Sequence, residues 1–209
     1  TQAGDTATGN HATQATAAEQ PKIVDAGTLL TAGVTFDGAD SLSVSGDPVI
    51  TASSSGTYSA FSVQTVDVSE DGYLYGNASA SNGTSLYANG DSNRAFMLSN
   101  ANTVALDNIA RSAGKNLLSA VYNNGDAGLL VNGAGTMTDS GTYNFSAGTS
   151  DFVIGNRNGG SADATFLTGS IREIIVYNSN QTDNRTAIEA NIGEVYSIDL
   201  PSGVDPGFD

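Results

Sequence analysis

Tyrosines and amide side chains occur together along residues 73–94, a combination that suits the recognition of sugars. A pyranose stacks its apolar face on an aromatic ring, while its hydroxyl groups bind amides or carboxylates. The stretch offers both kinds of side chain, in Tyr73, Tyr75, Tyr87, Asn89, Asp91, Asn93 and Arg94. We expect any bound ligand to lie on this loop-rich surface. The alternative is that the tyrosines are half-buried strand residues and that the asparagines form turns.

Chemistry that depends on histidine or cysteine has little support in the sequence. The single histidine, His11, lies in a stretch poor in large apolar residues, and the chain has no cysteine. A Ser-His-Asp triad, a histidine metal centre and thiolate chemistry are therefore disfavoured. Asp37 and Asp40 could bind calcium together with loop carbonyls, because hard cations prefer several oxygen ligands. They are equally suited to capping a β-turn, and we expect no other metal or cofactor.

Glu173 is unusual because it lies inside an otherwise apolar strand. Such a carboxylate is either satisfied by hydrogen bonds or functionally perturbed. Strict alternation along a strand places Arg172 on the opposite face. Arg157, Arg185 or backbone N–H groups are therefore the predicted partners of Glu173.

The balance of charge limits the partners of the chain. Twenty-two acidic and seven basic residues give a formal net charge of −15. This charge repels the phosphates of nucleic acids and anionic membrane surfaces. No apolar run approaches the roughly 20 residues needed to cross a bilayer, so we expect no membrane insertion. Solubility in a salty medium or a calcium-dependent surface would each explain the excess of acidic groups.

Residues 166–198 combine a clear strand with a clear helix. Ile171 to Tyr177 are β-branched or aromatic on both faces, which predicts an interior strand with Ile171, Ile175 and Tyr177 on one side. Apolar residues then recur with helical spacing, which predicts a helix over about 183–196, capped by Asp183.

The rest of the chain contains short strand-like runs at intervals of about ten residues, the spacing typical of a sandwich. Asn123-Asn124-Gly125-Asp126 separates two such runs and predicts a hairpin. We predict an all-β fold, an antiparallel two-sheet jelly-roll sandwich over residues 21–198, with an extended arm at 1–20 and an irregular tail at 199–209. The predicted core comprises Phe36, Phe61, Leu98, Leu118, Val121, Leu130, Phe152, Ile154, Ile171, Ile175, Ile188 and Ile192.

The C-terminal motifs resemble those of the concanavalin A-like lectin/glucanase superfamily, in its laminin-G-like branch. The family pattern I-x-E-I-I-x-Y is similar to residues 171–177, and D-x-R-x-x-I-E-x-x-I is similar to residues 183–192. Weaker similarity extends back through residues 152–158, 117–133, 34–42 and 5–21. The resemblance implies a jelly-roll domain of the kind found in phage virion proteins and bacterial surface proteins.

The resemblance also implies that both lectins and hydrolases are conceivable. Glucanases of this group place two glutamates around an aspartate along one strand. Here Asp67, Glu70 and Asp71 lie in a turn-like stretch, and Glu173 has no carboxylate two or four residues away.

We therefore expect a non-catalytic extracellular module of a virion or cell surface, such as a phage structural or host-attachment protein. Its expected partners are other structural proteins or copies of itself, and a cell-surface glycan. The alternatives are a secreted bacterial carbohydrate-binding adhesin and a glycoside hydrolase-like enzyme.

Overall fold

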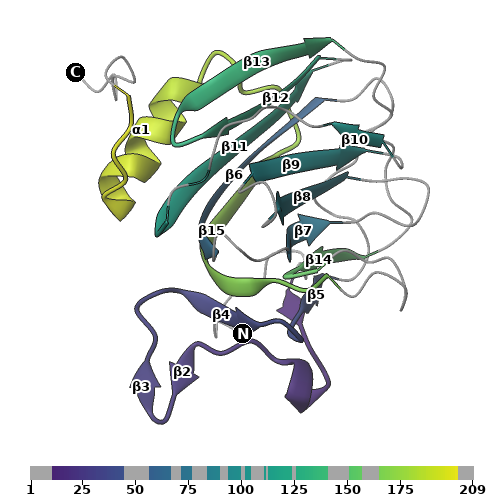
Figure 1. Cartoon of the computed structure of the whole chain (residues 1–209), viewed down its shortest axis with the longest axis vertical. Helices are drawn as coiled ribbons and strands as arrows, with labels where there is room; N and C mark the ends of the chain where they lie inside the picture. Colours follow the sequence, from purple (N-terminus) through teal and green to yellow (C-terminus); the bar gives the residue numbers. More distant parts are fainter. Residues whose placement is uncertain are drawn as a thin grey trace.

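Two antiparallel sheets stack face to face, and one helix covers the outer side of the second sheet (Figure 1). The computed structural model describes residues 11–44, 57–66, 72–76, 84–89, 94–99, 102–104, 111, 113–123, 126–140, 151–156 and 165–201. This arrangement confirms the predicted all-β sandwich with a C-terminal helix.

The first sheet has seven strands, in the spatial order β1 (Ala12–Thr13), β5 (Leu42–Val44), β14 (Phe152–Ile154), β7 (Gly72–Gly76), β8 (Thr84–Asn89), β9 (Arg94–Ser99) and β10 (Asn102–Val104). The second sheet has six, in the order β13 (Ala134–Ser140), β12 (Asp126–Val131), β11 (Lys115–Asn123), β6 (Thr57–Val66), β15 (Thr168–Tyr177) and β4 (Val34–Asp37). We call them the seven-stranded sheet and the six-stranded sheet.

Alternation along the strands builds the core between the two sheets. In β6, Tyr58 and Ala60 face the seven-stranded sheet, while Phe61 and Val63 face the other way. Aromatic and aliphatic side chains of both sheets fill this space, including Phe36, Leu74, Tyr75, Leu86, Leu118, Leu129 and Phe152.

A second, smaller core lies between the six-stranded sheet and helix α1 (Arg185–Tyr196). Phe61, Val63 and Leu117 contribute the sheet side, while Ile192 and Ile198 contribute the helix and the segment after it. The central strands of this sheet are therefore covered on both faces, as the apolar pattern of residues 171–177 predicts.

One detail of that strand differs from the prediction. Ile171 faces the core between the sheets, whereas Ile175 and Tyr177 face the helix. The register of β15 on β6 shifts between Ile171 and Glu173, which is a β-bulge, and the extra residue reverses the alternation.

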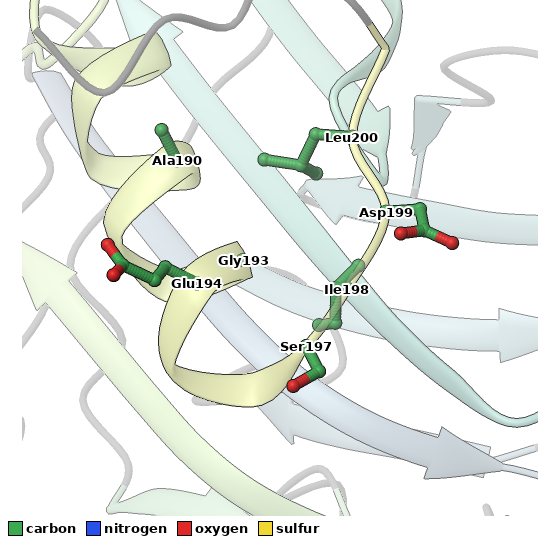
Figure 2. A pocket seen from close by; sticks show the side chains of 7 residues that line it. All are labelled: Ala190, Gly193, Glu194, Ser197, Ile198, Asp199 and Leu200. Atoms are coloured by element: carbon green, nitrogen blue, oxygen red, sulfur yellow. The ribbon is translucent and has the colours of Figure 1, made fainter.

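Helix α1 begins two residues later than predicted. Asn184 occupies the N-cap position and makes no side-chain capping bond, so the prediction that Asp183 caps the helix is wrong. At the other end, Ser197 adopts a left-handed conformation, and the amide of Ile198 donates to the Gly193 carbonyl at 2.9 Å. The chain then turns back along the helix, and Leu200 extends toward Ala190 and Gly193 around a shallow pocket (Figure 2).

Gly193 is the residue that permits this return. A Cβ atom at position 193 would lie 2.9 Å from Leu200 Cδ1 and 3.1 Å from the Ile198 carbonyl oxygen. The glycine weakens the isolated helix, but it allows residues 198–200 to pack directly against it.

Most of the predicted core residues are buried. Phe36, Phe61, Leu118, Val121, Leu130, Phe152, Ile171 and Ile192 are buried, while Ile154, Ile175 and Ile188 are partly buried and pack against the two cores. The side chain of Leu98 is outside the part of the chain that we describe. The predicted hairpin is also confirmed, because Asn123 pairs with Asp126 at the end of β11 and β12.

The N-terminal region contributes an edge strand to the sandwich and a separate small hairpin. Residues 12 and 13, within the predicted extended arm, form the edge strand β1 beside β5, and a short 3-10 helix follows at Ala17–Glu19. Strands β2 (Val24–Asp25) and β3 (Thr28–Leu29) then form a small hairpin that projects from the sandwich (Figure 1).

Candidate functional site

The segment predicted to bind a ligand forms three neighbouring strands of the seven-stranded sheet. Tyr73 in β7 lies opposite Tyr87 in β8, and their ring centroids are 4.8 Å apart with the planes inclined by 49°. Two residues further along β8, Asn89 lies opposite Arg94 in β9. These four predicted residues therefore lie at the same end of adjacent strands. Asp91 and Asn93 are outside the described residues.

The tyrosine pair lies on the outer face of the seven-stranded sheet. Leu86 belongs to the core between the sheets, so its neighbour Tyr87 faces away from that core. Tyr73 is 6% exposed, whereas Tyr87 is only partly buried. Of the two rings, Tyr87 is the one with surface available to a ligand.

Tyr75 does not belong to this surface. Its side chain is 0% exposed and stacks on Phe152 inside the core, with centroids 5.4 Å apart and planes inclined by 26°. Burial raises the pKa of its hydroxyl well above the ordinary value. The prediction that Tyr75 is a stacking surface is wrong, because the β7–β8 register shifts between Tyr73 and Tyr75 and places the two rings on opposite faces.

Asp37 and Asp40 form the corner at which the chain passes from the six-stranded sheet to the seven-stranded sheet. The Asp37 amide donates to Asp40 Oδ2 at 3.0 Å, and the Ala39 amide donates to Asp37 Oδ1 at 3.1 Å. Asp40 is 3% exposed, and the loss of hydration raises the pKa of its carboxyl. These hydrogen bonds are the ones expected if Asp37 and Asp40 cap a β-turn. Within the described ranges, no three His, Cys, Asp or Glu side chains cluster as a metal site would require.

Glu173 and Arg172 lie on the same face, contrary to the prediction. The bulge turns both side chains outward: Arg172 Nη1 donates to Thr65 Oγ1 at 3.0 Å, and Glu173 lies beside the Tyr196 hydroxyl. Burial, and then the charge of Glu173, raises the pKa of the Tyr196 hydroxyl. Among the predicted partners, Arg185 pairs instead with Glu189, at 2.5 Å, and Arg157 is outside the described residues.

A pocket that the sequence did not suggest lies beside Arg172, on the outer face of the six-stranded sheet. Its volume is about 450 Å³, and its lining combines hydroxyl groups with small residues, among them Ala32, Thr35, Thr65, Gly114, Thr168 and Ser170.

Strand pairing aligns three of these hydroxyls in one row. Thr35 of β4 lies opposite Ser170 of β15, and Ser170 lies opposite Thr65 of β6. The row continues to Lys22 at one end and to Lys115 at the other. We call Lys22, Thr35, Ser170, Thr65 and Lys115 the hydroxyl row. Thr35, Thr65 and Ser170 come from three different strands, and only the pairing of these strands brings them together.

The sequence profile of the concanavalin A-like lectin/glucanases superfamily matches residues 36–185. The chain belongs to this superfamily. A comparison with curated proteins gives no match. In the part of the chain that we describe, no helix has the length and apolar character required to span a membrane.

Several proteins of known structure share the fold at low sequence identity. Domain 4 of the extracellular arabinanase AbnA from Geobacillus stearothermophilus, solved with arabinotriose, has a TM-score of 0.60 and 15% identity, covering 79% of this chain and 77% of that one. The CBM40 of the Ruminococcus gnavus IT-sialidase has a TM-score of 0.52 and 15% identity, covering 63% and 81%. A mutant Trypanosoma rangeli sialidase has a TM-score of 0.54 and 13% identity, covering 78% of this chain but 28% of the sialidase. These similarities establish the sandwich fold.

Proposed function

We propose that this chain is a non-catalytic, extracellular carbohydrate-binding module. The carrying observation is the aromatic pair on the outer face of the seven-stranded sheet, where Tyr87 presents part of its ring beside Tyr73. Contact with Tyr73 already restricts the Tyr87 ring. A sugar that stacks on Tyr87 therefore causes little further loss of side-chain conformational entropy.

The position of Tyr87 in the sheet supports this role. The β8–β9 hairpin carries Asn89 and Arg94 beyond Tyr87, and these residue types bind sugar hydroxyls. Related sandwiches have been solved with arabinotriose and with sialyllactose, which supports glycan binding by this chain.

The surroundings of three carboxylates singled out in the sequence support a non-catalytic role. Asp37 and Asp40 bind amides of their own turn, and Glu173 lies beside the Tyr196 hydroxyl. A glycosidase needs two carboxylates that face each other across the scissile bond. We further propose that the module acts on the surface of a virion or a cell, where it attaches to glycans and assembles with other structural proteins.

Glycan-array screening followed by calorimetry tests the binding proposal. Tyr87→Ala should weaken binding of the selected glycan by about 1 kcal/mol or more without a matching loss of thermal stability. Tyr177→Ala is the control, because Tyr177 contacts Phe61 edge-on under helix α1, on the other sheet. That variant should lose stability and keep glycan affinity. Absence of glycan binding, or equal losses of binding in both variants, would contradict the proposal.

A further inference from the structure

The hydroxyl row has a chemical character different from that of the tyrosine pair. Thr35, Ser170 and Thr65 lie side by side on three strands, and they line a pocket whose other walls include Ala32, Gly114 and Gly169. Small walls leave room for a ligand, and the volume of about 450 Å³ is in the range of small-molecule sites.

Arg172 sets the direction of the Thr65 hydroxyl. Its Nη1 donates to Thr65 Oγ1 at 3.0 Å, so the threonine oxygen already accepts one hydrogen bond. A hydroxyl that accepts from a cation has its own proton left to donate to another acceptor. Because Thr65 lines the pocket, this proton favours a ligand that carries acceptor oxygens there.

Positive charge gathers at this row in a strongly acidic protein. The chain has seven basic residues and a net charge of −15, yet Lys22 and Lys115 end the row and Arg172 binds the Thr65 hydroxyl beside Lys115. Lys115 Nζ also donates to the main-chain oxygen of Tyr196, and Lys22 Nζ lies 3.7 Å from Asp25 Oδ1. A local cluster of cations raises the concentration of anions at a surface that otherwise repels them.

Besides Asp25, two acidic groups lie near the row. Glu173 follows Arg172 and lies close enough to the Tyr196 hydroxyl for its charge to raise the pKa of that group, while Asp37 pairs along the strand with Thr168 and accepts from the Ala39 amide. Asp25 is paired with Lys22, and Asp37 has a hydrogen bond within its own turn.

We propose that this pocket binds the carboxylate-bearing sugar unit, a uronate or a sialate, of an acidic glycan. The inference rests on the proposed carbohydrate-binding function and adds a second site with a different ligand class. The carboxylate accepts from Thr65 and meets the positive potential of Arg172 and Lys115, while the sugar hydroxyls bind Thr35 and Ser170.

Amide NMR titrations of the whole chain with glucuronate, N-acetylneuraminate and glucose test this site. We expect the two acids, but not glucose, to shift the resonances of Thr65, Gly114 and Gly169. Thr65→Val keeps the shape of the side chain and removes the hydroxyl, so it should weaken binding of the acids about tenfold or more. Thr65→Ser should restore most of that affinity.

Three further arms separate the outcomes. Arg172→Gln should weaken binding of the acids and leave neutral glycans unaffected, whereas Tyr87→Ala should leave the acids unaffected. Acetate that reproduces the full effect of the acidic sugars would overturn the proposal, as would wild-type affinity of Thr65→Val with an unchanged melting temperature. Absence of neutral-glycan binding by the wild-type chain, with the acids still bound in this pocket, would contradict only the site proposed on the seven-stranded sheet.

Discussion

Tyr73 and Tyr75 are separated by a single residue, yet their environments differ completely. Tyr73 contacts Tyr87 on the outer face of the seven-stranded sheet, while Tyr75 is enclosed against Phe152. Among the described residues, the Tyr75 hydroxyl has no hydrogen-bond partner. The ring contributes apolar contacts, and the hydroxyl adds a desolvation cost of about 1 to 3 kcal/mol.

Substitutions of Tyr75 should separate these two contributions. Tyr75→Phe retains the ring and should leave the free energy of unfolding unchanged or raise it by about 1 kcal/mol. Tyr75→Ala removes the ring and should lower it by about 3 to 5 kcal/mol. Urea denaturation measures both values. A substantial loss in Tyr75→Phe would show that the hydroxyl has a stabilising partner.

Two glycines with the same backbone conformation should differ in the cost of an added methyl group. Gly27 has φ +83° with no atom within 4 Å of the added Cβ, whereas Gly155 has φ +81° and a Cβ there would lie 2.4 Å from the Phe36 ring. Gly27→Ala should cost about 1 to 2 kcal/mol from backbone strain alone. Gly155→Ala should cost about 1 to 3 kcal/mol more, because of overpacking in the core.

Chemical denaturation of the two alanine variants gives the comparison. Their shared φ makes Gly27→Ala the strain control for Gly155→Ala. Equal losses would mean that the Phe36 ring moves aside at no cost.

Local patterns in the sequence specify individual elements well. The apolar run over residues 171–177 predicts β15, the helical spacing predicts α1, and Asn-Gly chemistry predicts the β11–β12 hairpin. Each of these signals depends on neighbours along the chain. The bulges in β7 and β15 depend instead on how a strand meets its partner, so alternation misassigned Ile171 and Arg172, and composition alone could not show that Tyr75 faces the core.

The candidate sites follow the same division. Tyr73 and Tyr87 were predicted because their segment is rich in tyrosine and asparagine, and the structure brings the two rings into contact. The hydroxyl row was not predicted, because Thr35, Thr65 and Ser170 lie far apart in the chain and are joined only by strand pairing.

Helix α1 offers a test in which propensity and packing oppose each other. Alanine in place of Gly193 favours a helix by about 1 kcal/mol. The added Cβ would meet Leu200 Cδ1 at 2.9 Å and the Ile198 oxygen at 3.1 Å, so we expect Gly193→Ala to lower stability by about 1 kcal/mol instead.

A double-mutant cycle with Leu200→Ala isolates the steric part of this effect. In that background, Gly193→Ala should cost less, because one of the two close contacts is gone. An increase in melting temperature for Gly193→Ala alone would show that helix propensity dominates.

The molecule as a whole carries a large excess of negative charge. The chain has twenty-two acidic and seven basic residues, and the acidic groups in excess repel one another more in the compact state than in the unfolded chain. Added salt screens this repulsion, with a screening length of about 10 Å at 0.1 M.

Stability should therefore increase with ionic strength. We expect the melting temperature to rise by a few degrees, on the order of 3 to 8 °C, between about 0.02 and 0.5 M sodium chloride. Differential scanning fluorimetry with sucrose as the uncharged control separates screening from general solute effects. A fall in melting temperature with salt would mean that attractive pairs outweigh the net repulsion.

Strand β6 occupies the middle of the six-stranded sheet, and both of its neighbours come from much later in the chain. Phe61 pairs with Ser119 of β11 on one side and with Ile175 of β15 on the other. During synthesis, residues 57–66 leave the ribosome before β11 and β15 have been made. The backbone groups on both edges of β6 therefore have no strand to pair with at that stage. Pairing between strands that are far apart in the sequence is slow. Until it occurs, the exposed edges of β6 can pair with strands of other nascent chains. The six-stranded sheet is therefore completed late in synthesis, since β15 cannot pair with β6 before residue 177 is made.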